Sequence, residues 1–207
     1  MRHGFTLIEL MIVIAIIAII AAIAIPNLLE SRISSNEAAA ASSLKAGVFP
    51  AEVQFQAGGY VDNGGPNIAT ANGIGDFACR FEALSGTTGT AANGLPTVAL
   101  SLLPNSWTAV APNVNSYNFV VGSNYEVNFC AACFPSDNLA SIGRRCFAIN
   151  AGGTVYATAP AATNPTTLIG SAVSLTTAST PTNTVQSGVP FGTTYTSAIS
   201  TWSVYKR

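Results

Sequence analysis

The sequence predicts an α+β fold in which one long N-terminal helix packs on a small antiparallel β-sheet. An apolar run extends from Phe5 to Ile25 and contains a single charged side chain, Glu9. From Asn27 to about Ala57 the apolar residues recur at three, four or seven positions, which is typical of one buried helix face. After Gly58-Gly59, short β-prone segments alternate with turn-forming residues, as in a small sheet.

The apolar run is long enough to cross a membrane. At ~1.5 Å per residue, Phe5 to Ile25 reaches about 30 Å, the thickness of the hydrocarbon core. A carboxylate inside such a segment costs on the order of 3 kcal/mol on insertion scales, so Glu9 is expected to have a specific partner. Arg2, in the short flank before the run, predicts a cytoplasmic N-terminus.

The residues before the run differ from an ordinary secretory signal, in which a small-residue cleavage site follows the apolar stretch. Here only Met1 to Gly4 precede the run. Cleavage after Gly4 would keep the helix and create a free amine on Phe5, four residues before Glu9 and on the same helix face. The Phe5 ammonium is therefore the predicted partner of Glu9. A plain single-pass anchor would explain the apolar run but not the carboxylate.

Gly4, the segment Phe5-Thr6-Leu7-Ile8-Glu9-Leu10, the Ile/Ala-rich run that follows and Pro26 resemble the type IV pilin and pseudopilin family. The resemblance covers Met1 to about Ala57. It implies that a prepilin peptidase and methyltransferase cuts after Gly4 and methylates the amine of Phe5. It also implies a pilin-like fold and homopolymerisation into a filament on an inner-membrane assembly platform, with the helix in membrane lipid before assembly.

Assembly through the helix has a physical basis. When a subunit leaves the bilayer, the same helices of its neighbours must bury its apolar surface. Small residues allow close helix packing, and the run supplies Ala15, Ala18, Ala21, Ala22 and Ala24. If the Phe5 ammonium of an incoming subunit pairs with Glu9 of a subunit already in place, a misaligned subunit would bury an unpaired charge. The pair is thus expected to set the register.

Two prolines bear on the helix. Pro26 is expected to kink or locally melt it, although Pro26 could instead begin a second helix as a first-turn residue. Pro50 is expected to kink the amphipathic part or to end it at Phe49. Gly58-Gly59 is the firmer stop. The charged residues of this part fall mostly off the apolar stripe; they are Glu30, Arg32, Glu37, Lys45 and Glu52.

The expected organisation is a cleaved leader (1–4), an assembly helix (5–25), an amphipathic helix (26–58) and a globular domain (59–207). Within the domain, Asp76 to Leu84 is expected to form a short helix capped by Asp76 and stopped near Gly86. A hairpin turn is expected at Ala151-Gly152-Gly153, and Ala159 to Ser197 is a Thr/Ser-rich loop or surface cover. The expected strands are Tyr117–Val121, Tyr125–Phe129, Arg145–Asn150, Thr154–Thr158 and Ile199–Tyr205.

Four cysteines, Cys79, Cys130, Cys133 and Cys146, follow the apolar helix. On the oxidising side of a membrane an even count predicts two disulfides, with three possible connectivities. The Cys130-x-x-Cys133 motif leaves two alternatives open. It could bind a metal, with Cys79 and Cys146 completing four ligands, or it could carry out thiol exchange.

Other chemistry is not indicated. The one histidine, His3, lies in the leader, so no Ser/His or Cys/His catalytic pair is expected in the mature chain. We expect neither an enzyme nor a cofactor. A net charge of −1 offers no basic patch for sequence-specific nucleic-acid binding. Asp62-Asn63-Gly64 only partly matches a calcium loop, because the closing glutamate is missing.

The leading hypothesis is a subunit of a type IV pilus that serves attachment, twitching motility or DNA uptake. Within the same family, the alternative is a pseudopilin of a type II secretion system. From a different class, the alternative is a membrane-tethered periplasmic thiol or metal protein that uses Cys130 and Cys133.

Overall fold

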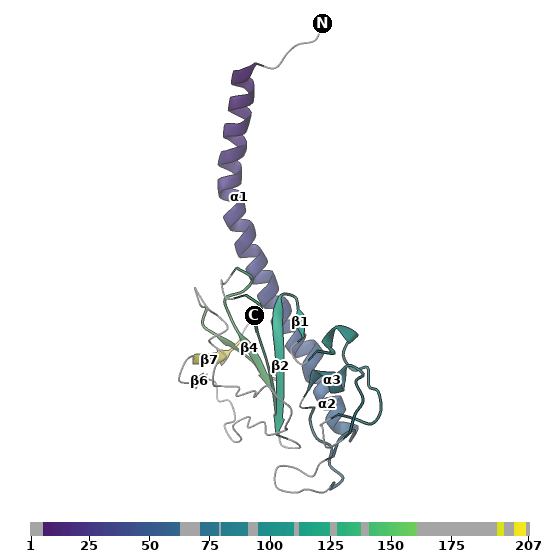
Figure 1. The fold of residues 1–207 in the computed structure, drawn as a ribbon. Coiled ribbons are helices and arrows are strands. Elements are labelled where there is room, and N and C mark those ends of the chain that lie inside the picture. The colour runs from purple at the N-terminus through teal and green to yellow at the C-terminus, as the bar shows by residue number, and fades with distance from the viewer. Residues whose placement is uncertain are drawn as a thin grey trace.

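One long helix projects from a globular part that is built around one β-sheet (Figure 1). The computed structural model describes residues 6–62, 71–78, 80–90, 95–109, 112–124, 128–137, 141–160, 194–196 and 201–205. Helical structure is continuous over 51 residues, from Leu7 to Ala57. It comprises α1 (Leu7–Ser42), a π-helical turn (Ser43–Val48) and α2 (Phe49–Ala57). The long helix and sheet confirm the predicted α+β class.

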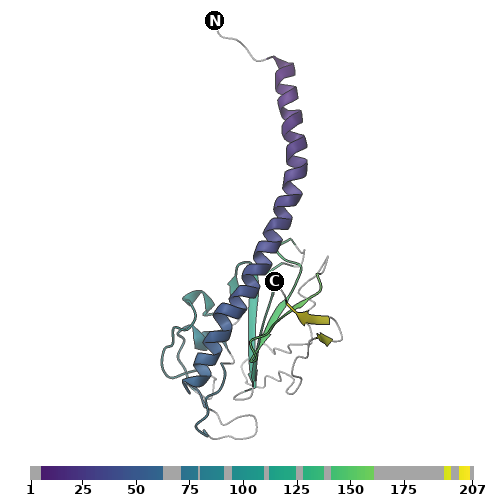
Figure 2. The same cartoon turned by 180° about the vertical axis from the view of Figure 1, so that it is seen from behind.

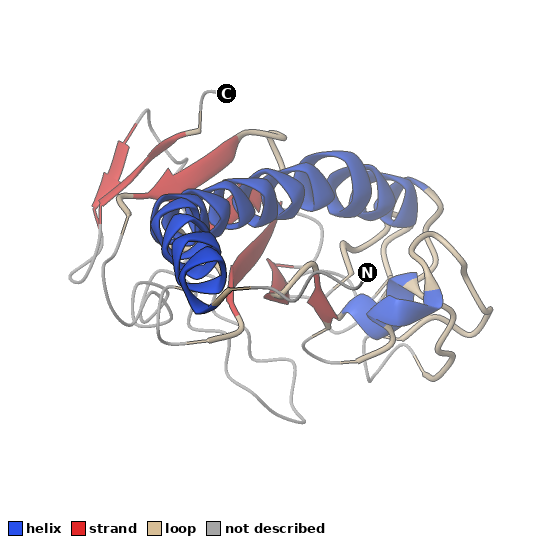
Figure 3. Cartoon of the chain, turned by 90° about the horizontal axis from the view of Figure 1, so that it is seen from above, coloured by secondary structure: helices blue, strands red, loops and turns tan. Residues whose placement is uncertain are grey.

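Among the described residues the sheet has seven strands in the order β1-β2-β3-β4-β5-β7-β6, and every neighbouring pair is antiparallel. The lower half of the long helix lies over one face of this sheet (Figures 2 and 3). The strands are β1 (Asn113–Val114), β2 (Tyr117–Asn124), β3 (Asn128–Pro135), β4 (Phe147–Asn150), β5 (Val155–Thr158), β6 (Thr194–Thr196) and β7 (Thr201–Val204).

Four of the five expected strands correspond to β2, β4, β5 and β7, with ends shifted by up to three residues. The turn between β4 and β5 also forms where expected, with Gly153 at a φ of +70°. The remaining prediction, Tyr125–Phe129, was misplaced: β3 begins at Asn128 and runs to Pro135, so it contains the C-x-x-C motif. Residues 125–127 and most of the Ser/Thr-rich tract lie outside the described residues.

The core lies between the long helix and the sheet. Leu44, Val48 and Phe55 are fully buried on the helix side, as their spacing predicted. Alternate strand residues meet them from the sheet, because successive side chains of a strand point to opposite faces. These include Tyr117, Phe119, Val121, Phe129, Ala131, Phe147 and Ile149. The contact covers only the C-terminal half of the helical rod, and Leu29, at the upper end of the predicted stripe, is 50% exposed.

Pro50 neither ends the helix nor leaves it a simple α-helix. The π-helical turn Ser43–Val48 directly precedes it, and the Phe49 N–H closes that turn on the carbonyl of Leu44, five residues back. Proline has no N–H and crowds the preceding turn, so a wider turn at this place relieves the clash. The helix therefore continues to Ala57, where Gly58 caps it and Gly59 follows at a φ of +61°.

Glu52 lies in the core, although the sequence pattern had put it off the buried stripe. It stands beside buried Ala51 and four residues after buried Val48, so it lies at the edge of the same helix face. Glu52 is 0% exposed, and its Oε2 accepts a 2.9 Å hydrogen bond from the Ala78 N–H. Its Oε1 has no hydrogen-bond partner. Burial raises the pKa of Glu52 well above its ordinary value, against the opposing effect of the Ala78 hydrogen bond.

The short helix is α3 (Phe81–Leu84), much shorter than the expected Asp76–Leu84. Asp76 does not cap it: that side chain is buried, and the Asp76 N–H donates to the carbonyl of Val61. The segment before α3 thus runs extended against the end of the long helix. The predicted stop is confirmed, because Gly86 has a φ of +107° just after α3.

Glu52 makes stability depend on pH in a direction opposite to most carboxylates. Its folded pKa lies above the reference value of 4.5, so its protonated form contributes stability that is full below that pH and is lost as pH rises through the folded pKa. We expect the free energy of unfolding to fall as the pH rises above that reference value and through the folded pKa. Urea unfolding of the full chain in detergent, followed by tryptophan fluorescence, measures it.

Glu52→Gln keeps an oxygen that accepts from Ala78 but cannot ionise, and we expect it to flatten this pH dependence. Glu82→Gln is the control, because it removes one carboxylate at another place, on α3. An unchanged pH profile in Glu52→Gln would contradict the burial of an ionisable Glu52.

Candidate assembly site

The long helix begins with a reciprocal cap made by Thr6 and Glu9. Oε2 of Glu9 accepts from the Thr6 backbone N–H at 2.8 Å and from the Thr6 hydroxyl at 2.7 Å. The Glu9 N–H donates in return to Thr6 Oγ1 at 3.4 Å. This capping box pairs polar groups that the first turn of a helix otherwise leaves without partners. It thereby gives Glu9 local partners at the start of an apolar helix.

The sequence analysis did not predict Thr6 as a partner of Glu9. The signal was present, because Thr6-Leu7-Ile8-Glu9 is the spacing of a capping box. The sequence instead predicted the Phe5 ammonium as the partner of Glu9. Gly4 and Phe5 lie outside the described residues, so cleavage, methylation and that pairing stay predictions. The Thr6 contacts use Oε2 of Glu9.

The N-terminal half of α1 has no cover in the structure (Figure 1). From Leu7 to Ile25 its large apolar side chains are between 49% and 75% exposed. Burying one such side chain fully contributes about 1.5–3 kcal/mol, so this surface is strongly driven out of water. By length and composition, this is the one helix among the described residues that could cross a membrane. The residues concerned are Leu7, Ile8, Leu10, Met11, Ile12, Val13, Ile14, Ile16, Ile17, Ile19, Ile20, Ile23 and Ile25.

Pro26 lies inside α1, which stays helical on both sides of it. Pro26 therefore does not begin a second helix. Because proline lacks an N–H, the carbonyl four residues earlier has no helical donor, and such sites bend helices. The helix is visibly curved along its length (Figure 2). Local melting at Pro26 is not present in this structure of a single subunit.

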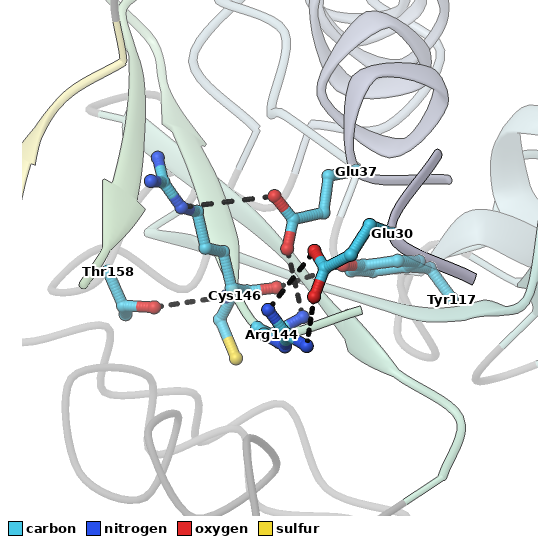
Figure 4. Close-up of polar contacts among 7 residues, drawn as sticks. Glu30, Glu37, Tyr117, Arg144, Cys146 and Thr158 are labelled. Carbon is cyan, nitrogen blue, oxygen red and sulfur yellow. Dashed lines mark hydrogen bonds and ion pairs between the residues drawn. The ribbon is translucent and has the colours of Figure 1, made fainter. Parts of the chain in front are cut away.

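A loop between β3 and β4 fastens α1 to the sheet where the helix leaves the globular part (Figure 4). The two guanidinium NH groups of Arg144 contact Glu30 at 2.7 and 3.3 Å, and the Arg144 backbone N–H donates to Glu37 at 2.9 Å. Arg145 lies 3.8 Å from the other oxygen of Glu37. Asn36 donates to the carbonyl of Ile142 at 3.0 Å. We call residues 141–146 the docking loop.

The docking loop also contacts Tyr117 of β2. The Tyr117 hydroxyl donates to the Arg145 carbonyl at 3.1 Å. Burial, reinforced by the Glu37 carboxylate, raises the pKa of Tyr117, so it stays a donor at physiological pH. A Cβ at position 143 would lie 2.0 Å from the Tyr117 hydroxyl oxygen, which explains why glycine stands there.

The N-terminal region also matches known proteins. Residues 1–25 match the family model described as the prokaryotic N-terminal methylation motif. Over 54 residues the chain is 54% identical to the type IV major pilin protein PilA of Myxococcus xanthus, covering 26% of this chain and 24% of that protein. Over 61 residues it is 49% identical to the type IV wide pilus major component PilA4 of Thermus thermophilus, covering 29% of this chain and 47% of that protein.

The N-terminal region of the chain therefore carries the methylation motif and is similar to that of type IV major pilins. This confirms the resemblance stated from Gly4, Glu9 and Pro26. The likeness spans less than half of either relative, and the globular part of the chain lies largely outside it.

The three cysteines among the described residues do not form the expected arrangement. Cys130 and Cys133 lie three residues apart in β3, so they point to opposite faces of the sheet. Both are buried thiols, and burial raises the pKa of Cys130 to about 12. Cys146 continues β4, on the face opposite to Phe147, which pairs with Cys133. Cys130 pairs with Asn150 instead, ~13 Å along the strand from Cys146.

Disulfides require Cα atoms within about 7 Å and converging side chains, so these three cysteines do not pair with one another. Two disulfides within one chain need at least one bond among them, and the predicted pair of disulfides therefore does not fit this sheet. A bond from Cys79, which lies outside the described residues, stays a prediction.

The structure gives no support to a metal centre in the part of the chain that it describes. No group of three or more potential metal-ligating side chains gathers among those residues. Asp62, the first residue of the partial calcium motif, uses both carboxylate oxygens to accept backbone N–H groups of Asn72 and Gly73.

The contact at Gly143 can be tested by adding one methyl group. We expect Gly143→Ala to lower the free energy of unfolding by about 1–3 kcal/mol, because overpacking displaces the loop from Tyr117. Hydrogen exchange at the Arg144 amide should quicken as its bond to Glu37 loosens. Gly47→Ala is the control, since its Cβ would lie 4.0 Å from the nearest atom, a Leu103 methyl. Equal stability of the two variants would contradict the tight docking.

Proposed function

We propose that the chain is the repeating structural subunit of a type IV pilus. A prepilin peptidase cleaves it after Gly4, its new N-terminus at Phe5 is methylated, and it polymerises through residues 5–25. Before assembly the helix is held in the inner membrane with its N-terminus in the cytoplasm; afterwards it lies in an extracellular filament. The role is structural and not enzymatic.

The observation that carries this proposal is the uncovered half of α1, which is helically continuous with the half packed on the sheet. A bilayer or the helices of neighbouring subunits would bury this apolar surface. A helix that serves in both places must present the same apolar surface to lipid and to protein. The methylation motif over residues 1–25 supports the same proposal.

In the assembled filament we propose that Glu9 pairs with the Phe5 ammonium of a neighbouring subunit. The Thr6 cap uses one oxygen of the carboxylate and leaves Oε1 to accept a further donor. A cap within the subunit and a charge pair between subunits are therefore compatible. The filament would serve attachment, twitching motility or DNA uptake.

Two alternatives differ in their support. A type II secretion pseudopilin would share the same N-terminal helix, whereas the relatives named above are pilus components. The thiol or metal protein is disfavoured by geometry. Cys130 and Cys133 lie on opposite faces of a buried strand, and thiol exchange or metal binding by C-x-x-C requires both sulfurs on one side.

The direct test is the intact mass of the protein sheared from cell surfaces, measured without reduction. We expect a mature chain that begins at methylated Phe5. Recovery of that chain only from the membrane fraction would favour the pseudopilin. A chain that retains Met1 would refute the cleavage and leave a plain anchor.

Charge and capping at Glu9 can be separated with two variants. Glu9→Val removes both, whereas Glu9→Gln keeps an oxygen that accepts from Thr6 but loses the charge. If the intersubunit pair sets the register, both variants should insert in the membrane and yield no filaments, as counted by electron microscopy of sheared material. Normal filaments from Glu9→Gln would contradict the charge pair and leave the cap as the role of Glu9.

A further inference from the structure

The docking loop lies at a defined height above the apolar half of α1. Glu30 follows Ile25 by five residues, which corresponds to about 7–8 Å of helix. The headgroup region on each side of a bilayer is about 5–7 Å deep. With residues 5–25 in the membrane, as proposed above, Glu30 and the Arg144 guanidinium paired with it lie at the outer edge of the headgroup layer, on the side of the globular part.

Arg32 lies on the same stretch of helix, about 10 Å beyond Ile25. It is exposed, and no described residue forms an ion pair with it. Side chains of a helix tilt toward its N-terminus, which here is the direction of the bilayer. A long arginine side chain can therefore extend its guanidinium down to the phosphates while its carbon stem stays on the helix.

Arg144 retains donors for a second anion. A guanidinium has five N–H donors, and the contacts with Glu30 use two of its NH groups. Its side chain is 39% exposed. Arg144 can thus bind a phosphate without leaving Glu30, and after the phosphate is lost it still has its carboxylate partner.

Positive charges are concentrated where the helix leaves the globular part. Charged residues make up only 8% of the chain, whose net charge is −1. Five lysines and arginines lie in the described part, and three of them, Arg32, Arg144 and Arg145, gather where the helix leaves the globular part. Glu30 and Glu37 balance two of these charges, so one net positive charge remains.

We propose that Arg32 and Arg144 bind the phosphate groups of anionic phospholipids in the membrane that holds the subunit before assembly. The contact fixes how deeply the helix sits, so that the apolar run is matched to the hydrocarbon core. It is reversible, because each arginine near an anionic membrane surface contributes only about a fivefold preference. Extraction into a filament leaves Arg144 paired with Glu30.

The test uses the full chain in nanodiscs made from equal parts of phosphatidylcholine and phosphatidylglycerol. Native mass spectrometry of the released protein gives the ratio of the two lipids that stay bound. We expect phosphatidylglycerol to be enriched several-fold over the bilayer, Arg32→Gln to reduce the enrichment about fivefold, and Arg32→Gln with Arg144→Gln to abolish it.

Lys45→Gln is the matched control. Lys45 is a cation on the same helical rod, but it lies about 30 Å beyond Ile25, several Debye lengths from the membrane. Arg32→Gln breaks none of the contacts described above, so it tests the proposal even if Arg144→Gln disturbs the docking loop. Three results would each overturn the proposal. The unchanged chain could retain the two lipids in the same ratio as the bilayer, the double substitution could keep the enrichment, or Lys45→Gln could lose as much enrichment as Arg32→Gln.

The proposed lipid contact and the proposed pilus function can be refuted independently. Surface filaments without lipid enrichment would refute the lipid contact alone. Lipid enrichment in a chain that never reaches the cell surface would support the membrane contact and refute the pilus subunit.

Discussion

The apolar surface between Leu7 and Ile25 must be kept out of water, and the remainder of the described chain offers it no cover. The helix that carries this surface also covers the core over the sheet. The exposed half and the buried half of the helix are therefore joined rigidly, without a flexible linker. The globular part is consequently fixed to the end of a membrane-length helix. The cap at Thr6, the bend at Pro26 and the docking loop all act on this one helix.

Much of the fold was predictable because it rests on periodicity. The spacing of Leu44, Val48 and Phe55 identified the buried helix face, and β-prone segments between turn-forming residues identified β2, β4 and β5. These patterns are local, and tertiary packing reinforces them instead of opposing them. The long apolar helix was equally predictable, since Phe5 to Ile25 forms an unbroken apolar run of membrane length with one carboxylate.

Other features depended on information that no local pattern carries. Glu52 was expected off the buried stripe, and its partner is the backbone N–H of Ala78, which lies 26 residues away in the chain. The even number of cysteines predicted disulfides, but the placement of both Cys130 and Cys133 within β3 set them on opposite faces. At the site, Thr6 was readable as a cap. The contact of Arg144 with Glu30 was not, because 114 residues separate the two in the chain.

The position of the docking loop has a mechanical consequence. In the filament proposed above, tension would pull on each subunit along its helix, and the force would enter the globular part where α1 emerges from it. The contacts of Glu30, Asn36 and Glu37 lie at that point of entry. They pass the force to β2 and β4 before it reaches the buried apolar contacts around Leu44 and Phe55. The helix and the sheet are thereby loaded together, so that tension is shared across the sheet and does not peel the helix away from one end.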